Sequence, residues 1–344
     1  MVPPDQPPEA APDGTGGDWR VYKGNSAPHG GIDRLPPPPP WRRFGAYDPA
    51  TAGRPADLER AVSYRVDPLV ADKVNAALHL RRPLLVTGKP GSGKSTLAYN
   101  IAYELGLGPV LYWPISSRTT LQQGLYDYDA IGRVQEANVR RANVPADEAM
   151  PAIGRYVRLG PLGTALLPQV RPRVLLIDEL DKSDIDLPND LLNVLEEGRF
   201  SVPELERLPE DGPPIEVMTA DDEGRAPIRR GQVRCLDFPI VVITSNGERE
   251  FPPAFLRRCV RVAIEPPSGE RLADIVAAHL GEEARDGGRA LIEEFLDRRR
   301  GGDLATDQLL NAIYLATSGA RPPETTLAQL VEAIMRPLDT AGPG

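Results

Sequence analysis

The sequence predicts an α/β fold, in which helices cover both faces of a parallel sheet, followed by a small all-helical domain. Three observations support this. Short apolar runs without polar alternation are typical of strands buried on both faces. Helical stretches such as 94–105 and 187–197 lie between several of these runs, which is the alternation of a doubly wound domain. After Pro266 and Pro267 the runs stop. The runs are 83–86, 110–113, 174–177, 240–243 and 260–264.

The N-terminal segment differs in composition from the rest. The chain has 344 residues with 38 Pro and 32 Gly, and residues 1–40 hold 11 of these prolines and 6 of these glycines. Such low-complexity composition predicts a largely disordered tail over residues 1–57. The segment 17–47 also contains aromatic residues that a plain linker rarely needs, which leaves open that it docks on the body or recruits a partner.

The body of the chain begins at residue 58. Apolar residues between 66 and 78 recur at helical spacing, and the α/β domain is predicted over 58–265. Residues 201–231 are rich in Pro, Gly and acidic residues, which predicts a loop or hairpin inserted before the fourth strand. The all-helical domain is predicted over 266–337, with a short tail at 338–344. Its helical stretches are 268–280, 289–300, 304–317 and 324–336.

Charge and cysteine content exclude several classes of protein. A formal net charge of −9 argues against a general nucleic-acid-binding or anionic-membrane surface. Two cysteines cannot form a secreted disulfide framework. No apolar run approaches the roughly 18 residues of a membrane span, and the N-terminus lacks the apolar region of a signal peptide. We therefore expect a soluble, cytoplasmic protein with no membrane partner.

A glycine-rich loop follows the first apolar run. Residues 88–95 read GKPGSGKS and match the phosphate-binding pattern G-x-x-x-x-G-K-[ST]. A buried strand precedes this loop and an apolar-faced helix follows it, with Gly106 as its expected C-cap. Backbone N–H groups and the helix N-terminus would then bind phosphate oxygens. The predicted nucleotide-binding residues are Gly88, Lys89, Pro90, Gly91, Ser92, Gly93, Lys94, Ser95, Thr96 and Asp178.

Two residues of the loop have specific predicted roles. Lys94 should reach the β- and γ-phosphates of ATP, and the Ser95 hydroxyl should ligate Mg²⁺. Only five of the 40 basic residues are lysines, and two of them, Lys89 and Lys94, lie in this loop. A lysine is therefore a rare residue here, and Lys94 occupies the position where the pattern specifies one.

The third apolar run ends in two carboxylates, Asp178 and Glu179. The carboxyl ends of the strands in an open α/β sheet are where ligands bind. Asp178 would hold Mg²⁺ through water, and Glu179 would act as a general base on the attacking water. A second carboxylate favours an NTP hydrolase over a small-molecule kinase, because a kinase of that kind needs no carboxylate beside an attacking water molecule.

Two further features follow the last strands. Asn246 ends the fourth run and could orient the attacking water. Arg257 and Arg258 precede the fifth run. An arginine with no acidic partner nearby could complete the active site of a neighbouring subunit by neutralising charge in the transition state.

This set of motifs resembles the AAA+ ATPases. Walker A corresponds to 88–95 and Walker B to 174–179. Sensor 1 corresponds to Asn246, and the arginine finger to Arg258, with Arg257 as the second choice. Within that superfamily the chain is most similar to the MoxR group over about residues 58–336. The similar stretches are 158–165, 178–183 and 191–198, and the insertions at 115–157 and 201–235 fall where that group carries extra elements.

The resemblance implies a Mg-ATP-hydrolysing machine that assembles as a homo-oligomeric ring, expected to be a hexamer. It further implies a chaperone-like action on a protein client, with a von Willebrand factor A domain protein as a possible partner. One departure concerns the sensor 2 arginine, which is missing from residues 304–310. Arg298 to Arg300 lie just before that place, and Arg321 lies after it.

Three other functions remain open. A P-loop kinase for a small molecule is disfavoured by the Asp178–Glu179 pair and by the helical C-terminal domain. An ATP-dependent switch or scaffold with low turnover is compatible with a missing sensor 2. A DNA-driven motor is disfavoured because no separate DNA-reading domain is visible and the chain is acidic.

Overall fold

The computed structural model describes residues 39, 61, 64, 66–141, 151–209, 211–300, 304–317 and 324–336. The predicted tail over 1–57, apart from Pro39, and the tail at 338–344 lie outside the described residues, as does Arg321.

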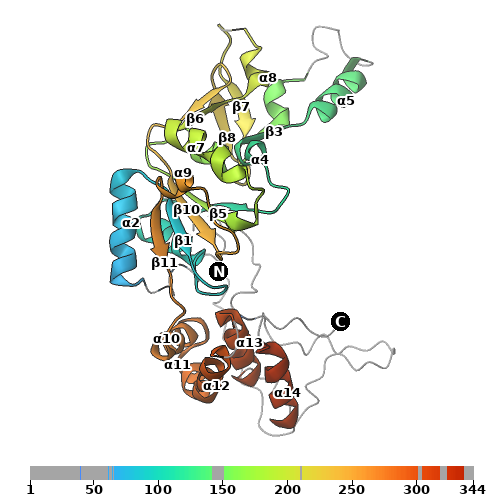
Figure 1. Cartoon of the computed structure of the whole chain (residues 1–344). Helices are drawn as coiled ribbons and strands as arrows, with labels where there is room; N and C mark the ends of the chain where they lie inside the picture. The colour runs from blue at the N-terminus through green and yellow to red at the C-terminus, as the bar shows by residue number, and fades with distance from the viewer. Residues whose placement is uncertain are drawn as a thin grey trace, which may run out of the picture.

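The centre of the molecule is a five-stranded sheet whose strand pairs are all parallel (Figure 1). The predicted parallel sheet is confirmed. Its order is β11-β1-β10-β5-β2, so β10 lies between the strand before the glycine-rich loop and the strand that ends in carboxylates. The strands are β1 (Leu84–Thr87), β2 (Leu111–Pro114), β5 (Val174–Asp178), β10 (Ile240–Ser245) and β11 (Val260–Ala263).

Burial along the strands follows their place in the sheet. The inner strands β1, β5 and β10 are almost continuously buried, whereas residues of the edge strand β2 alternate between buried and exposed. Successive residues of a strand point to opposite faces, and Leu85 packs in one apolar cluster while Leu84 and Val86 pack in another. The sheet therefore separates two cores, one on each face.

Different helices cover the two faces. Helices α2 (Pro68–Leu80) and α3 (Thr96–Glu104) bury Val74, Leu97 and Ile101 in the cluster of Leu84. On the other face, buried residues of three further helices pack in the cluster of Leu85. These are α4 (Leu121–Leu125), α6 (Pro161–Ala165) and α7 (Leu187–Glu197).

The two predicted insertions meet in a second sheet of four strands, in the order β3-β4-β7-β8. The insertion before the fourth strand contains the antiparallel hairpin β7–β8, as predicted, and β7 also pairs with β4 of the earlier insertion. A small sheet joins β6 and β9. The elements are β3 (Tyr126–Tyr128), α5 (Ala130–Arg141), a short 3-10 turn (Ile153–Tyr156), β4 (Val157–Leu159), β6 (Arg199–Ser201), α8 (Pro203–Glu206), β7 (Ile215–Met218), β8 (Arg225–Ile228) and β9 (Gln232–Arg234).

The C-terminal helices form a body with its own apolar core at the opposite end of the sheet from these insertions (Figure 1). All four predicted helical stretches contain a helix. Helix α11 was missed because it is short and buries little besides Ala284. No helix in the described parts of the chain is long and apolar enough to span a bilayer. The helices are α10 (Gly269–Leu280), α11 (Glu282–Gly287), α12 (Arg289–Arg299), α13 (Thr306–Thr317) and α14 (Glu324–Ile334).

Candidate functional site

The glycine-rich loop connects β1 to α3 and follows a path that needs glycine. Gly91 and Gly93 have φ angles of 70° and 87°, in the left-handed region that side chains disfavour. A Cβ atom on Gly93 would lie 2.9 Å from the ring of Tyr64, and one on Gly91 would lie 2.7 Å from the Cβ of Ala305 in the helical domain. The loop is therefore packed tightly from both sides.

Lys94 is held inside this loop. Its side chain donates hydrogen bonds from Nζ to the carbonyl oxygens of Gly88 and Lys89, both at 2.8 Å, and the residue is only 7% exposed. Burial lowers the pKa of Lys94, while the charges of Asp181, Asp178 and Glu179 act in the opposite direction. A buried ammonium group of this kind favours an anionic partner, such as a phosphate.

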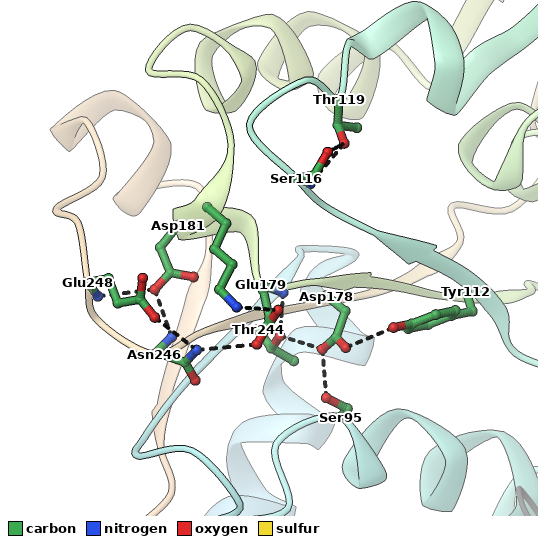
Figure 2. A network of polar contacts seen from close by, with 11 residues as sticks. Ser95, Tyr112, Ser116, Thr119, Asp178, Glu179, Asp181, Thr244, Asn246 and Glu248 are labelled. Atoms are coloured by element: carbon green, nitrogen blue, oxygen red, sulfur yellow. Dashed lines mark hydrogen bonds and ion pairs between the residues drawn. The ribbon is translucent and has the colours of Figure 1, made fainter. Parts of the chain in front are cut away.

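The two predicted magnesium residues lie side by side. Ser95 Oγ donates a hydrogen bond of 2.6 Å to Asp178 Oδ1, and Thr244 Oγ1 donates to the same oxygen at 2.7 Å. Tyr112 donates from its hydroxyl to Asp178 Oδ2 at 3.3 Å (Figure 2). A hydroxyl beside a carboxylate is the hard oxygen donor set that Mg²⁺ prefers, so these residues fit the expected ion.

Glu179 follows Asp178 in an unusual backbone conformation. Its φ of 61° is left-handed, and its N–H donates to Thr244 Oγ1 at 2.8 Å. The carboxylate accepts a hydrogen bond of 2.8 Å from Lys182 Nζ on Oε2 and one of 3.4 Å from Asn246 Nδ2 on Oε1. The hydrogen bond to Glu179 raises the pKa of Lys182. Left-handed non-glycine residues cluster at functional sites, where the surroundings hold them in place.

Asn246 is held through its backbone by Asp181. This aspartate is 3% exposed, and its Oδ2 accepts hydrogen bonds from the N–H groups of Asn246 at 2.9 Å and Glu248 at 3.1 Å. The turn after β5 therefore anchors the turn after β10 (Figure 2). This anchoring explains how Asn246 comes to lie within reach of Glu179.

Lys94, Ser95, Asp178, Glu179, Thr244 and Asn246 line one cavity of about 610 Å³, a volume within the range of small-molecule sites. The sheet domain contributes most of the loop residues and the polar strand ends. Gly88 and Lys89 contribute only the carbonyl groups that hold Lys94. From the sheet domain and the segment before it, the lining residues include Tyr64, Pro90, Gly91, Ser92, Gly93, Lys94, Ser95, Thr96, Tyr99, Asp178, Glu179, Thr244 and Asn246.

The helical domain closes the other side of the cavity with residues that the sequence analysis missed. They come from the linker, α10 and α13, and include Arg271, Ile275, His279, Thr306, Asp307 and Leu310. Burial raises the pKa of the neighbouring Tyr64 to about 12, and the charge of Arg271 acts in the opposite direction. Within a run of helices rich in surface arginine, no local pattern distinguishes Arg271.

Of the arginines considered for a displaced sensor 2, the three that the structure describes, Arg298, Arg299 and Arg300, do not line this cavity. Arg298 forms an ion pair with Glu294, and Arg300 forms one with Asp297, each within α12 or at its end. Arg299 donates to the carbonyl oxygen of Pro267 at 2.9 Å. Among the described residues, Arg271 is therefore the arginine that the helical domain brings to the cavity wall.

Arg257 and Arg258 lie away from the cavity of their own chain. The expectation of an arginine without an acidic partner is wrong for Arg258, which forms an ion pair with Glu196 of α7 and donates to the carbonyl oxygen of Ala254 at 2.9 Å. Contact between α7 and α9 (Pro253–Leu256) brings Glu196 within reach. Arg257 is exposed and forms no ion pair within the described ranges.

Comparisons with known proteins bear on residues 83–259. A family model described as AAA domain (dynein-related subfamily) matches this range, which is slightly more than half of the chain. The matched range begins just before β1 and includes the glycine-rich loop, Asp178, Glu179, Asn246 and both arginines before β11. A comparison with curated proteins found no significant match.

Proposed function

The chain belongs to the AAA domain family, in its dynein-related subfamily, and we propose that it binds and hydrolyses Mg-ATP as a ring-forming ATPase of MoxR-like type. The observation that carries this proposal is the hydrogen-bonded network of Ser95, Asp178, Thr244, Glu179 and Asn246. That network lies on the same cavity as Lys94.

The residues divide between binding and chemistry. Lys94 and the loop N–H groups bind the β- and γ-phosphates. The Ser95 hydroxyl and the Asp178 carboxylate would hold Mg²⁺, which neutralises charge on those phosphates when bound. Tyr64, Ile275 and Leu310 add apolar surface to the cavity. We assign these three side chains to binding of the heterocyclic base of the nucleotide.

In the chemical step, a water molecule attacks the γ-phosphorus of ATP. Glu179 accepts a proton from this water, while Asn246 orients the water and the carboxylate. The bond between the γ-phosphorus and the bridging β,γ-oxygen breaks, and the electron pair leaves on ADP. The products are ADP and inorganic phosphate, with no phosphorylated acceptor.

An arginine from a neighbouring subunit completes the site in this proposal. Arg258 is the first candidate and Arg257 the second. Both lie on the segment before β11 and away from the cavity of their own chain. For Arg258 to reach a neighbour, its ion pair with Glu196 has to open on ring assembly. Arg257 needs no such exchange, because it is exposed.

Mixing two inactive variants tests this arrangement. Glu179→Gln lacks the base but keeps the arginines, and Arg258→Ala lacks the finger but keeps the base. If the finger acts between subunits, a mixture of the two regains phosphate release, because some interfaces then combine an intact base with an intact finger. The same mixture made with Arg257→Ala tests the second candidate. A normal rate for Arg258→Ala alone excludes it as the finger.

Phosphate release measured over a range of protein concentrations separates the remaining classes of function. A ring-forming hydrolase releases equal amounts of ADP and phosphate, with a specific rate that rises as subunits assemble. A small-molecule kinase produces ADP without free phosphate, and a switch or scaffold binds ATP with little turnover.

We extend the proposal to a protein client, because the chain resembles the MoxR group beyond the residues of the site. In that group a von Willebrand factor A domain protein is the expected kind of partner. Glu179→Gln with ATP should stall the ring with its client bound. Affinity capture with this variant, and with Lys94→Ala as the nucleotide-free control, tests the extension.

A further inference from the structure

Lys182 contacts the proposed general base from outside the cavity. Its Nζ lies 2.8 Å from Glu179 Oε2, and the two side chains are 42% and 40% exposed. Glu179 and Asn246 line the cavity, whereas Lys182 is not among the described residues that do so. Lys182 therefore lies outside the cavity to which we assign the nucleotide, and we expect it to act through Glu179.

The two oxygens of Glu179 have different partners. Oε2 accepts the short bond from Lys182, and Oε1 accepts the longer bond of 3.4 Å from Asn246. A hydrogen bond of that length is weak. Oε1 is therefore the carboxylate oxygen that is available to accept a hydrogen bond from a water molecule. The backbone cannot rotate to compensate, because the Glu179 N–H is bonded to Thr244.

We propose that Lys182 is a positioning residue, which pins Oε2 of Glu179 so that Oε1 faces the cavity beside Asn246. This inference rests on the proposed function of Glu179 as general base. Lys182 transfers no proton and forms no bond to the nucleotide. It restricts the rotation of the Glu179 carboxylate, so that Glu179, as the general base, and the side-chain amide of Asn246 contact the same water molecule.

The local structure suits this role. Lys182 ends the short 3-10 turn Leu180–Lys182 directly after Glu179, a spacing that places both side chains on one side of the turn. Lys182 is one of only five lysines in a chain with 35 arginines. An ammonium group is a compact point charge, whereas a guanidinium group is a broad planar fork. A compact charge fits beside one carboxylate oxygen without covering the other.

The surrounding charges do not supply a substitute for Lys182. Asp178, Asp181 and Glu248 add negative charge around Glu179. Two other cations in the described part of the chain have partners of their own, and one of them, Arg249, donates a hydrogen bond of 2.7 Å to the carbonyl oxygen of Ser183. Lys94 is bonded to Gly88 and Lys89 within the loop. Loss of Lys182 should therefore release the carboxylate rather than transfer it to another cation.

The test compares Lys182→Met with Lys182→Arg and with Lys73→Met, which changes an exposed lysine on α2. We expect Lys182→Met to lower kcat about tenfold, as loss of orientation in an acid–base step does, with KM and the affinity for a fluorescent ATP analogue within about twofold. Lys182→Arg should restore only part of kcat, because its planar fork keeps the charge but also reaches toward the second carboxylate oxygen, and Lys73→Met should match the wild type. An exposed ion pair contributes little to stability, so thermal unfolding should be unchanged.

A second readout does not depend on steady-state turnover. After one round of binding, Lys182→Met should retain a larger share of intact ATP than the wild type does. Adding Lys182→Met to Glu179→Gln should cause no further loss, because both changes act on the same group. A wild-type kcat for Lys182→Met, or an equal loss in affinity and kcat, overturns the inference. If the wild type itself hydrolyses no ATP, the proposed function fails and this inference fails with it.

Discussion

The two walls of the cavity are built in different ways. On the sheet side, polar residues are tied to one another by hydrogen bonds, with Asp178 bonded to Ser95 at 2.6 Å, to Thr244 at 2.7 Å and to Tyr112 at 3.3 Å. On the helical side, residues from α10 and α13 reach the same space, and the contact with the loop is a close approach of Ala305 to Gly91. The first wall is held by this network, and the second is the surface of a body with its own apolar core.

This difference indicates that the two walls of the cavity have different functions. A network of buried, mutually bonded groups fixes atoms in place and suits the chemical step. A packed surface on a separate apolar core can shift as a body, which suits a part that responds to the nucleotide. Changes on the sheet side should therefore abolish binding or turnover, and changes on the helical side should tune affinity.

The largest effect should come from Lys94→Ala. This change removes the buried cation to which we assign the phosphates, and we expect nucleotide affinity to fall by at least about 100-fold, as loss of a charge-assisted buried contact does. Titration with a fluorescent ATP analogue measures the loss. Lys73→Ala on the surface of α2 is the control and should bind as the wild type does. Near-normal affinity of Lys94→Ala for the ATP analogue would contradict a role of the loop in nucleotide binding.

Thr244→Val should have the next largest effect. The variant keeps the shape of a fully buried side chain but removes the hydroxyl that bonds both Asp178 and the Glu179 N–H. We expect kcat to fall about tenfold or more, because the Asp178 carboxylate and the Glu179 N–H each lose a hydrogen-bond partner. Steady-state phosphate release provides the measurement. Thr317→Val, which removes only a bond to Ile313 within α13, should leave kcat unchanged, and equal losses in both variants would contradict the network.

Gly91→Ala probes the boundary between the two walls. A Cβ atom here would contact Ala305 at 2.7 Å on a backbone with φ of 70°. We expect about a tenfold loss of ATP affinity, because the helical body has to move away from the loop. Gly108→Ala is a matched control, since its φ is 78° with no atom within 4 Å of an added Cβ. If both variants bind alike, the contact between the walls has no role in binding.

The smallest effect should come from Arg271→Gln on the helical wall. Arg271 lines the cavity from α10. We expect a rise in Kd for ATP of about three- to fivefold with little change in kcat, the size of one partly solvated charged contact. Parallel Kd and kcat measurements check this, with Arg289→Gln, an exposed arginine paired with Asp286, as the control. A large loss of kcat in Arg271→Gln would instead indicate that this arginine takes part in the hydrolysis step.

The sequence analysis predicted the sheet side well because its information is local. Apolar runs identified all five central strands, and the loop 88–95 and the pair Asp178–Glu179 are each contiguous in sequence. The loop and the pair each end a strand, and parallel strands bring their carboxyl ends to one edge. Motif and topology together were therefore enough to bring Lys94, Asp178 and Asn246 together.

The remaining features depend on tertiary contacts that leave no local pattern. The insertion of β10 between β1 and β5, and the pairing of β7 with β4, are decided by the assembled sheets. Glu196 becomes the partner of Arg258 only because α7 packs on α9. Arg271 likewise lines the cavity because of how the helical body docks. For Lys182 the sequence does carry a signal, since lysine is rare in this chain.

The most direct test of ATP hydrolysis at this site is a single-turnover experiment with ATP labelled at the γ-phosphate, comparing the wild type with Glu179→Gln. We expect both proteins to bind ATP with similar affinity. The wild type should convert it to ADP and free phosphate, and Glu179→Gln should keep it intact over the same period. Wild-type hydrolysis by Glu179→Gln, or transfer of the label to an organic acceptor, would contradict the central claim that this network hydrolyses ATP with Glu179 as its base.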